Sequence, residues 1–449
     1  MCGGYGGRDR RPIVNSTKPA PNAYVSQGAC AILIVGAGPA GLSAALAAAP
    51  AGRSIVVLDD NPAPGGQVWR NGAGAAPPGP LQQLQEALAR YPRVRIHCGT
   101  RVVAAQGSQA LLLESADSAW VQGFEKLIVC TGARELLLPF PGWTLPDVSG
   151  AGGLQAMIKG GLPVRGQRIV IAGSGPLLLA AAASATQAGA QVLRVAEQSP
   201  WRQVAAFGAR LLRWPGKLAQ AATLLHPAYR CDSYVLAAQG DTSLQSVQLR
   251  QGAHTYQLDC DRLAVGFGLV PNVELGRLLG CATRHSAQAG LALQVDAQQS
   301  TSVPYIFAAG ECTGAGGVER AMAEGHIAGL TAIGQRVPAA HLHTRARWQD
   351  FASRVGQHFA LRPELRTLAD KNTLLCRCED VTFGSVAACT GWNDAKLHQR
   401  CGMGACQGRI CGAAAQHLFG WDAPSPRPPL SPARVSTLSL ASNDTGALP

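Results

Sequence analysis

The fold of this chain is decided by residues 31–42, which read AILIVGAGPAGL. An apolar run leads into GAGPAG, and an alanine-rich segment follows. This order predicts a strand, a glycine turn and a helix, which form the first half of a βαβ unit. Residues 54–58 read SIVVL and predict the next strand, which ends at Asp59. The folded part of the chain therefore begins with a dinucleotide-binding fingerprint.

The three glycines of this first fingerprint have separate roles. Gly36 permits the tight turn, Gly38 lets the backbone approach a pyrophosphate, and Gly41 lets helix and strand pack closely. The helix N-terminus then directs partial positive charge at the phosphates. Asp59 follows at the distance expected for an acid that accepts hydrogen bonds from an adenosine ribose. The fingerprint thus predicts an adenosine-containing dinucleotide without a 2′-phosphate.

A distant segment decides which dinucleotide is expected. Residues 301–311 read TSVPYIFAAGE and predict a buried strand that delivers Gly310 and Glu311 to a glycine-rich helix start. Glu311 suits a ribityl hydroxyl, and the following helix would face the flavin pyrimidine edge, where negative charge grows on reduction. A further predicted strand, residues 126–130, enters Thr131 and Gly132. Together these segments predict FAD.

A second fingerprint, GSGPLL at residues 173–178, is degenerate. Gly173 and Gly175 are present, but Leu178 stands where the third glycine belongs, and Glu197 takes the place of the ribose-binding acid. Three alternatives stay open here: NAD(P), another adenine nucleotide such as ATP, or a structural relic that binds nothing.

Six of the 14 cysteines fall between residues 376 and 411. Five of them are candidate ligands, Cys376, Cys378, Cys401, Cys406 and Cys411, and the sixth, Cys389, is expected to be buried packing. Closely spaced soft thiolates suit a 2Fe–2S cluster or zinc, and a reduced module without metal is a third alternative. The last of them would lie in the first turn of a helix over 409–418, where the helix dipole favours a thiolate. The chain has no C-x-x-C pair, so disulfide reduction through such a pair is not expected.

Several of these motifs resemble known families. Residues 36–41, 131–132 and 308–311 resemble the flavoprotein disulfide reductase superfamily, whose first fingerprint holds FAD. The segment 373–422 resembles the 2Fe–2S domain of bacterioferritin-associated ferredoxin. That resemblance implies four ligands: Cys376, Cys378, Cys406 and Cys411. Because Cys401 also stands five residues from Cys406, spacing alone leaves it as an alternate ligand.

The whole order of segments over 30–422 resembles the larger flavoprotein subunit of opine oxidases, hydrogen cyanide synthase, D-hydroxyproline dehydrogenase and dye-linked L-proline dehydrogenase. The run 59–70, DDNPAPGGQVWR, carries part of this likeness. It implies that Gly66 and Gln67 lie against the flavin ring. It also implies a smaller FAD-containing subunit that oxidises the amino acid, and a small ferredoxin-like subunit.

These motifs predict an α/β fold with two dinucleotide-binding, Rossmann-like domains of the flavoprotein disulfide reductase type and a small C-terminal cysteine-rich α module. The expected parts are these: a mobile arm (1–29), an FAD domain (30–148 and 276–340), a second nucleotide-binding domain (149–275), a helical linker (341–372), a 2Fe–2S module (373–422) and a disordered tail (423–449).

Composition narrows the function classes. The net charge of +12 comes from scattered residues, so nucleic-acid binding is not expected, whereas contact with a membrane periphery is compatible with it. The first 29 residues lack the apolar core of a signal peptide, and the uncharged stretches contain glycine turns. We therefore expect a cytoplasmic protein, with the inner face of the cytoplasmic membrane as its alternative location.

FAD accepts electrons in pairs and an iron–sulfur cluster carries them singly. A chain with both is expected to be an oxidoreductase subunit that passes electrons from the oxidation of an amino or imino acid or an opine to an acceptor. The alternatives are a stand-alone NAD(P)H-dependent reductase and a non-enzymatic redox or cluster protein. No residue is assigned a catalytic acid or base role.

Overall fold

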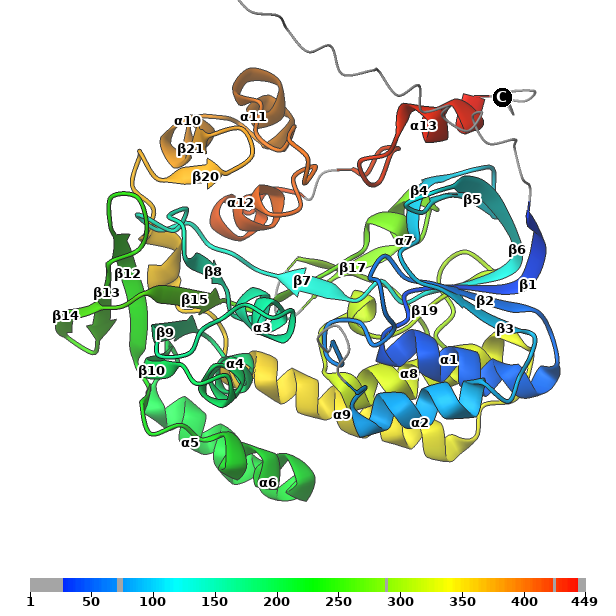
Figure 1. Ribbon diagram of the computed structural model, residues 1–449, viewed down its shortest axis with the longest axis horizontal. Coiled ribbons are helices and arrows are strands. Elements are labelled where there is room, and N and C mark those ends of the chain that lie inside the picture. The colour runs from blue at the N-terminus through cyan, green and yellow to red at the C-terminus, as the bar shows by residue number, and fades with distance from the viewer. Residues whose placement is uncertain (1–26, 71–75, 287–289, 423–424, 443–449) are drawn as a thin grey trace, which may run out of the picture.

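The computed structural model describes residues 27–70, 76–286, 290–422 and 425–442. Within them, two α/β domains lie side by side, and a small helical module and a C-terminal segment lie above them in Figure 1. The predicted fold class is confirmed. Of the predicted mobile arm, residues 1–26 lie outside the described residues, and 27–29 already belong to the first strand.

The first domain is built on a seven-stranded sheet of order β3-β2-β1-β6-β5-β4, with β19 paired to β6. Its strands are β1 (Gln27–Val35), β2 (Ile55–Leu58), β3 (Val94–His97), β4 (Arg101–Ala105), β5 (Ala110–Glu114), β6 (Ala119–Val129) and β19 (Ile306–Ala308). Strands β1, β2, β3, β6 and β19 run parallel, so their carboxyl ends meet at one edge. That edge carries every loop of the first fingerprint site.

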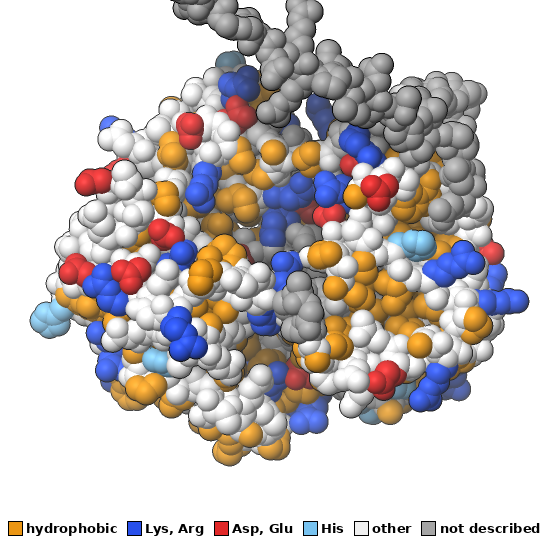
Figure 2. Space-filling model, viewed as in Figure 1, with side chains coloured by type: hydrophobic (Ala, Val, Ile, Leu, Met, Phe, Trp, Pro, Cys, Tyr) orange, Lys and Arg blue, Asp and Glu red, His pale blue; other side chains and the backbone are white. Residues whose placement is uncertain are grey.

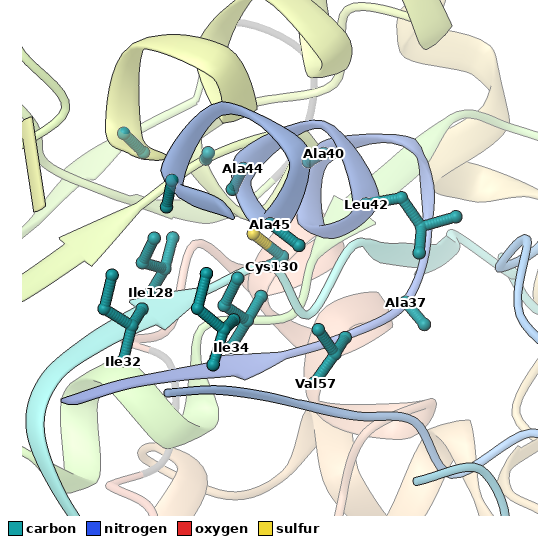
Figure 3. Packing of buried hydrophobic residues seen from close by; sticks show 14 of the residues in the cluster. Ile32, Ile34, Ala37, Ala40, Leu42, Ala44, Ala45, Val57, Ile128 and Cys130 are labelled. Atoms are coloured by element: carbon teal, nitrogen blue, oxygen red, sulfur yellow. The ribbon is translucent and has the colours of Figure 1, made fainter. Parts of the chain in front are cut away.

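Helices α1 (Pro39–Ala48) and α8 (Val318–Ala332) cover this sheet in unusually close contact. A Cβ at Gly325 would lie 2.1 Å from the carbonyl oxygen of Ala40, and one at Gly329 would lie 2.3 Å from that of Ala44. Figure 3 shows the small side chains of α1 over the isoleucines of β1 and β6. Small residues on both helices therefore bring α8 down onto the fingerprint helix.

The second domain has a five-stranded parallel sheet of order β11-β10-β9-β15-β8 and an antiparallel three-stranded sheet. Its strands are β8 (Val148–Gly150), β9 (Arg168–Gly173), β10 (Gln191–Glu197), β11 (Tyr229–Arg230), β12 (Ser233–Gln239), β13 (Ser246–Gln251), β14 (His254–Asp259) and β15 (Arg262–Gly266). Its helices are α3 (Ala151–Lys159), α4 (Leu177–Gln187), α5 (Trp201–Arg210) and α6 (Pro215–Leu224).

The two domains are joined by paired strands β7 (Ala133–Glu135) and β16 (Leu269–Pro271). Beyond β7, Leu138 and Phe140 are fully buried in the core of the second domain. The boundary predicted at 148 therefore lies too late in the chain. Three short elements complete the first domain: α7 (Glu274–Leu278), β17 (Thr283–His285) and β18 (Leu291–Leu293).

The predicted linker is a packed helix, α9 (Ala339–His358), which begins before 341 and contacts α8 and α5. Phe351 of α9 packs its ring against Phe207 of α5 and Trp214. The cysteine-rich module follows and contains β20 (Leu374–Cys376), β21 (Val381–Thr382), α10 (Phe383–Ala387), α11 (Trp392–Gln399) and α12 (Cys411–Phe419). The predicted helix at 409–418 is thus present, and it begins at Cys411.

The prediction of a disordered tail over 423–449 is wrong for residues 425–442. Leu430 is buried in the core of the first domain, and its N–H donates to the carbonyl of Val103. Helix α13 (Val435–Ser442) follows, and the N–H of Arg434 donates to the carboxylate of Glu114 at 2.9 Å. The Pro- and Ser-rich composition misled because a few buried contacts are enough to fix such a segment.

Candidate functional site

The first glycine turn has no room for side chains. Gly36 has a φ of 112°, and a Cβ there would lie 2.2 Å from the carbonyl oxygen of Cys130. A Cβ at Gly41 would lie 1.8 Å from the carbonyl oxygen of Gly36. Both positions require glycine, because the turn folds back onto β6 and onto its own helix.

Two further segments frame this turn. Asp59, at the end of β2, accepts a hydrogen bond from the N–H of Ala37 at 2.6 Å. The N–H of Gly65 donates to the carbonyl of Ala37 at 2.9 Å, and a Cβ at Gly66 would lie 3.1 Å from the Cα of Gly38. The loop predicted to contact the flavin therefore lies directly on the fingerprint. Gln67, next in the loop, is exposed.

Asn272 holds the Thr131–Gly132 turn. The hydroxyl of Thr131 donates to the carbonyl of Asn272 at 2.6 Å, and the Asn272 amide donates back to the carbonyl of Thr131 at 2.9 Å. The N–H of Asn272 donates to the carbonyl of Gly132. Sequence reasoning did not single out Asn272, because it lies 141 residues from its partner in the chain.

Arg134, just past this turn, links the first domain to the cysteine-rich module. Its guanidinium donates to the side chain of Asn272 at 2.7 Å and pairs with Glu274 at 2.9 Å. Its Nε donates to the carbonyl of Arg409 at 3.0 Å, inside the cysteine loop. The module is therefore anchored next to the edge of the predicted flavin site.

A buried ion pair, also missed by sequence reasoning, organises the Gly310 loop. The Glu324 carboxylate is 2% exposed and accepts from Nε of Arg320 at 2.7 Å. It also accepts from the N–H of Gly310 at 3.0 Å and from the hydroxyl of Thr313 at 2.8 Å. Its only sequence signal was an Arg and a Glu four residues apart on one predicted helix.

Glu311 lies at the start of this loop, close to the N-terminus of α8. Burial raises the pKa of its carboxyl, and the backbone N–H groups of Gly317 and Gly316 oppose that effect. The Gly317 N–H donates to Glu311 at 3.3 Å. The acid predicted to meet a ribityl hydroxyl is thus placed between the end of β19 and the positive end of a helix.

The four loops at 36–41, 65–67, 131–132 and 310–317 all follow strands at one edge of the parallel sheet. Brought together, they offer a glycine turn at a helix N-terminus, an acid at the end of β2 and a second helix N-terminus at α8. This arrangement fits FAD, because it provides for the pyrophosphate, the adenosine ribose and the flavin edge at once.

The second fingerprint forms a glycine turn as tight as that of the first. Its helix, however, meets the neighbouring strand through a leucine instead of a glycine. A Cβ at Gly173 would lie 2.0 Å from the carbonyl oxygen of Gly266, as close as at Gly36. Leu178 is fully buried, and its side chain packs beside Gly266 on the neighbouring strand. Gly266 on β15 has no side chain, and this leaves the space that the Leu178 side chain of α4 occupies.

Residues 359–362 of the chain cover the glycine turn of the second fingerprint. The Ser174 hydroxyl donates to the carbonyl of Phe359 at 2.8 Å, and the Phe359 side chain lies against Gly175. The Gln198 amide donates to the carbonyl of Ala360 and accepts from the N–H of Arg362, each at 3.0 Å. Residues 359–362, directly after α9, therefore lie where a dinucleotide would cross the two strand ends.

Glu197 is fully buried beneath this segment. Its carboxylate accepts from the N–H of Gly175 at 2.7 Å and from that of Ser199 at 2.8 Å. Burial raises its pKa to about 7, against the opposing effect of these N–H groups. Backbone N–H groups hold Asp59 in the first fingerprint in the same way, so the feature that separates the two sites is the segment 359–362 beside Gly175. Of the three alternatives for Gly173, Gly175 and Glu197, this segment favours the one in which nothing binds.

In the cysteine-rich module, three thiols converge. The sulfur atoms of Cys376, Cys401 and Cys411 lie within 4.8 Å of one another, and all three residues are buried. Side-chain hydrogen bonds from Cys401 and Cys411 lower the pKa of Cys376 to about 2, and the N–H of Gly402 also points at its sulfur. Three soft donors around one point, with backbone N–H support, fit a thiolate-bound metal centre.

The other two predicted ligands form the outer part of the same group. Cys378 is exposed and lies within hydrogen-bond reach of Cys406. A Cβ at Gly404 would lie 2.3 Å from the Cβ of Cys378, so the glycine lets this loop close over the cysteines. The structure therefore brings Cys401 into the inner group and leaves Cys378 and Cys406 beside it.

The fold and these sites define a flavin oxidoreductase with two Rossmann-like domains. The chain belongs to the pyridine nucleotide-disulphide oxidoreductase family, whose model matches residues 30–328. It is 31% identical to an opine oxidase subunit of Rhizobium meliloti (strain 1021) over 86% of this chain and 91% of that protein. It is 32% identical to the hydrogen cyanide synthase subunit HcnB of Pseudomonas aeruginosa over 89% and 96% of the two chains.

Solved structures support the same fold. L-proline dehydrogenase from P. horikoshii superposes with a TM-score of 0.64 at 17% identity, over 93% of this chain and 81% of that one. Thioredoxin reductase from T. acidophilum superposes with a TM-score of 0.52 at 21% identity, over 68% and 98% of the chains. Among the described residues, no helix has the length and apolar character needed to cross a membrane.

Proposed function

We propose that this chain is the FAD- and 2Fe–2S-containing subunit of an amino-acid, imino-acid or opine dehydrogenase complex, and that it passes electrons from a partner protein to an acceptor. The observation that carries the proposal is the position of the cysteine group. Arg134 ties the cysteine loop to the Thr131–Gly132 turn through Asn272, at the edge of the flavin site. A flavin and a metal centre held there would be neighbours.

The first fingerprint would hold FAD through residues of this chain. Gly36 would form the tight turn, Gly38 would let the backbone approach the pyrophosphate, and Gly41 would let the helix pack closely on the strand. Asp59 would bind the ribose. Gly66, Gln67, Thr131, Gly132, Gly310 and Glu311 would line the ribityl and ring positions. FAD supplies two-electron chemistry when bound, and the buried Arg320–Glu324 pair keeps the Gly310 loop in place for it.

The metal centre is proposed as a 2Fe–2S cluster that takes its four ligands from the five clustered cysteines. Cys376 and Cys411 belong to both the set implied by resemblance and the buried group. The remaining two ligands come from Cys378, Cys401 and Cys406. Sequence spacing did not favour Cys401 among these three, whereas its burial beside Cys376 and Cys411 does.

The filled second fingerprint is an argument against a stand-alone NAD(P)H-dependent reductase. Phe359 and the residues after it would have to leave before a nicotinamide dinucleotide or ATP could reach Glu197. An electron donor other than NAD(P)H fits this arrangement better. The opine oxidase relative and HcnB are both named as subunits, so we infer that the donor is a smaller FAD-containing partner protein, with a small ferredoxin-like protein as a further member of the complex.

The test is an anaerobic titration of the purified chain, alone and together with the proteins encoded beside it, followed by visible absorption. Bleaching of the flavin by an amino or imino acid, only with the partner present, is the expected result. Rapid bleaching of the isolated chain by NADH would overturn the proposal in favour of the reductase. Absence of flavin and metal from the chain would favour a non-enzymatic role.

A further inference from the structure

We propose that a basic groove between the cysteine-rich module and the first domain binds a small anion with two or more negative charges, such as phosphate or a dicarboxylate. Three parts of the chain line this groove: the module, the residues around α7, and the C-terminal segment 425–430. Figure 1 shows these parts next to one another, between α12 and α7. The proposal is independent of the proposed function, because it requires neither a flavin nor a metal.

The groove has a closely packed apolar lining. Gly402 and Gly408 of the cysteine loop, residues 401–411, have positive φ values of 80° and 76°. A Cβ at these positions would lie 2.5 and 2.8 Å from the ring of Trp392, so the loop packs directly on this indole. Val270 and Val273 line the groove from the first domain. The enclosed volume of about 100 Å³ suits a small anion and is too small for a dinucleotide.

The charged side chains of the groove are almost all positive. Glu274 is its one carboxylate, and five Lys and Arg residues line it: Arg134, Arg277, Lys396, Arg409 and Arg427. Glu274 is already paired with Arg134 at 2.9 Å, so the groove keeps a large excess of positive charge. Figure 2 shows Lys and Arg side chains gathered around the hollow at the centre of this face. Like charges on low-dielectric walls raise the local concentration of anions.

Two of these arginines are held in place by the chain itself. Arg409 donates to the carbonyl of Cys406 at 3.4 Å and to the carbonyl of Leu430. Arg134 donates to the carbonyl of Arg409 at 3.0 Å. Their guanidinium groups are therefore oriented before an anion arrives, which lowers the entropic cost of binding it.

Lys396 and Arg427 are the groups that an anion would engage directly. Among the described residues, neither side chain makes a hydrogen bond or an ion pair. Lys396 belongs to α11 of the module and is only partly exposed, whereas Arg427 belongs to the C-terminal segment. An anion between them would accept hydrogen bonds from both and would tie the C-terminal segment to the module.

The number of cations favours an anion with more than one negative charge. Guanidinium and ammonium groups from several directions match the acceptor oxygens of phosphate, which all lie on one small centre. A short dicarboxylate offers the same charge at two ends, so it can reach both Lys396 and Arg427. A single carboxylate would leave more of the positive charge in the groove without a partner.

The test is isothermal titration calorimetry of the full chain with inorganic phosphate and, separately, with succinate, at an ionic strength held constant with chloride. Saturable binding of at least one probe is expected, and the probe that binds identifies the source of the charge. Acetate should bind about tenfold more weakly or worse, because it forms fewer charge-assisted hydrogen bonds. Equal binding of acetate would overturn the assignment of a doubly charged ligand.

A pair of variants locates the bound anion. Lys396→Gln with Arg427→Gln should weaken binding by about tenfold or more, since each change removes a charged donor. Arg427→Gln alone, at an exposed position, should already weaken it. Arg90→Gln with Lys371→Gln is the matched control, because it removes the same charge from exposed positions outside the groove.

Three results would overturn the proposal. The first is that neither phosphate nor succinate binds to the parent chain. The second is that the groove variants bind like the parent chain, which would place the anion elsewhere. The third is an equal loss of binding in the control, which would show unspecific attraction by net charge.

Discussion

Replacing Arg320 by Met should destabilise the flavin loop strongly. The Arg320 and Glu324 side chains are 8% and 2% exposed, and the Glu324 carboxylate holds Gly310 and Thr313. Without the guanidinium this carboxylate stays buried without a countercharge, which costs about 3–5 kcal/mol. We expect the unfolding free energy of Arg320→Met to fall by that amount, and flavin to be released at lower denaturant.

The assay is urea unfolding of the flavin-loaded chain, followed by flavin fluorescence on release. Arg354→Met is a matched control, because Arg354 pairs with Asp350 at the same four-residue spacing but both side chains are more exposed. It should change the unfolding free energy by about 1 kcal/mol or less. If Arg320→Met stays within about 1 kcal/mol of the parent chain, the buried pair does not organise the flavin loop.

Three further predictions concern the other parts of the site. Gly36→Ala should yield a chain without bound flavin, because the new Cβ would lie 2.2 Å from the Cys130 carbonyl oxygen; absorbance of the purified chain at flavin wavelengths measures this. Burial raises the pKa of Glu197 from 4.5 to about 7, so its ionisation weakens the fold as pH rises between these values, by about 3 kcal/mol. Glu197→Gln should remove that fall from unfolding curves measured across this pH range, and an unchanged fall would assign it to another group. Cys376→Ala should abolish metal binding while Cys389→Ala retains it, as measured by metal content; equal metal in both would exclude the clustered thiols as ligands.

The meeting of the loops proposed to hold the flavin was predictable because its signals are local. The glycine turn, Asp59 and the Gly310–Glu311 pair each stand at the end of an apolar run, and parallel strands bring such ends to one edge. The same logic left a bound nucleotide and an empty relic as alternatives at Glu197. It could not decide between them because the segment that covers this fingerprint comes more than 150 residues later and binds mainly through backbone carbonyls, which carry no sequence signal.

The buried supports of the site were not predictable for a related reason. Arg320, Glu324 and Asn272 look like ordinary polar residues until their distant partners are in place. Among the cysteines, spacing left Cys401 as an alternate to the set that contains Cys406. Only the folding of the loop around Gly402 and Gly404 shows that Cys401 is the buried thiol. Burial and contact between distant segments decide such cases.

The proposed function requires that one chain carries both a flavin and an iron–sulfur cluster. The most direct measurement is flavin, iron and sulfide content of the anaerobically purified chain, with electron paramagnetic resonance after reduction. We expect FAD together with a reduced 2Fe–2S signal that is lost in Cys376→Ala and Cys411→Ala. Zinc in place of iron, or FAD with no metal at the clustered cysteines, would contradict it.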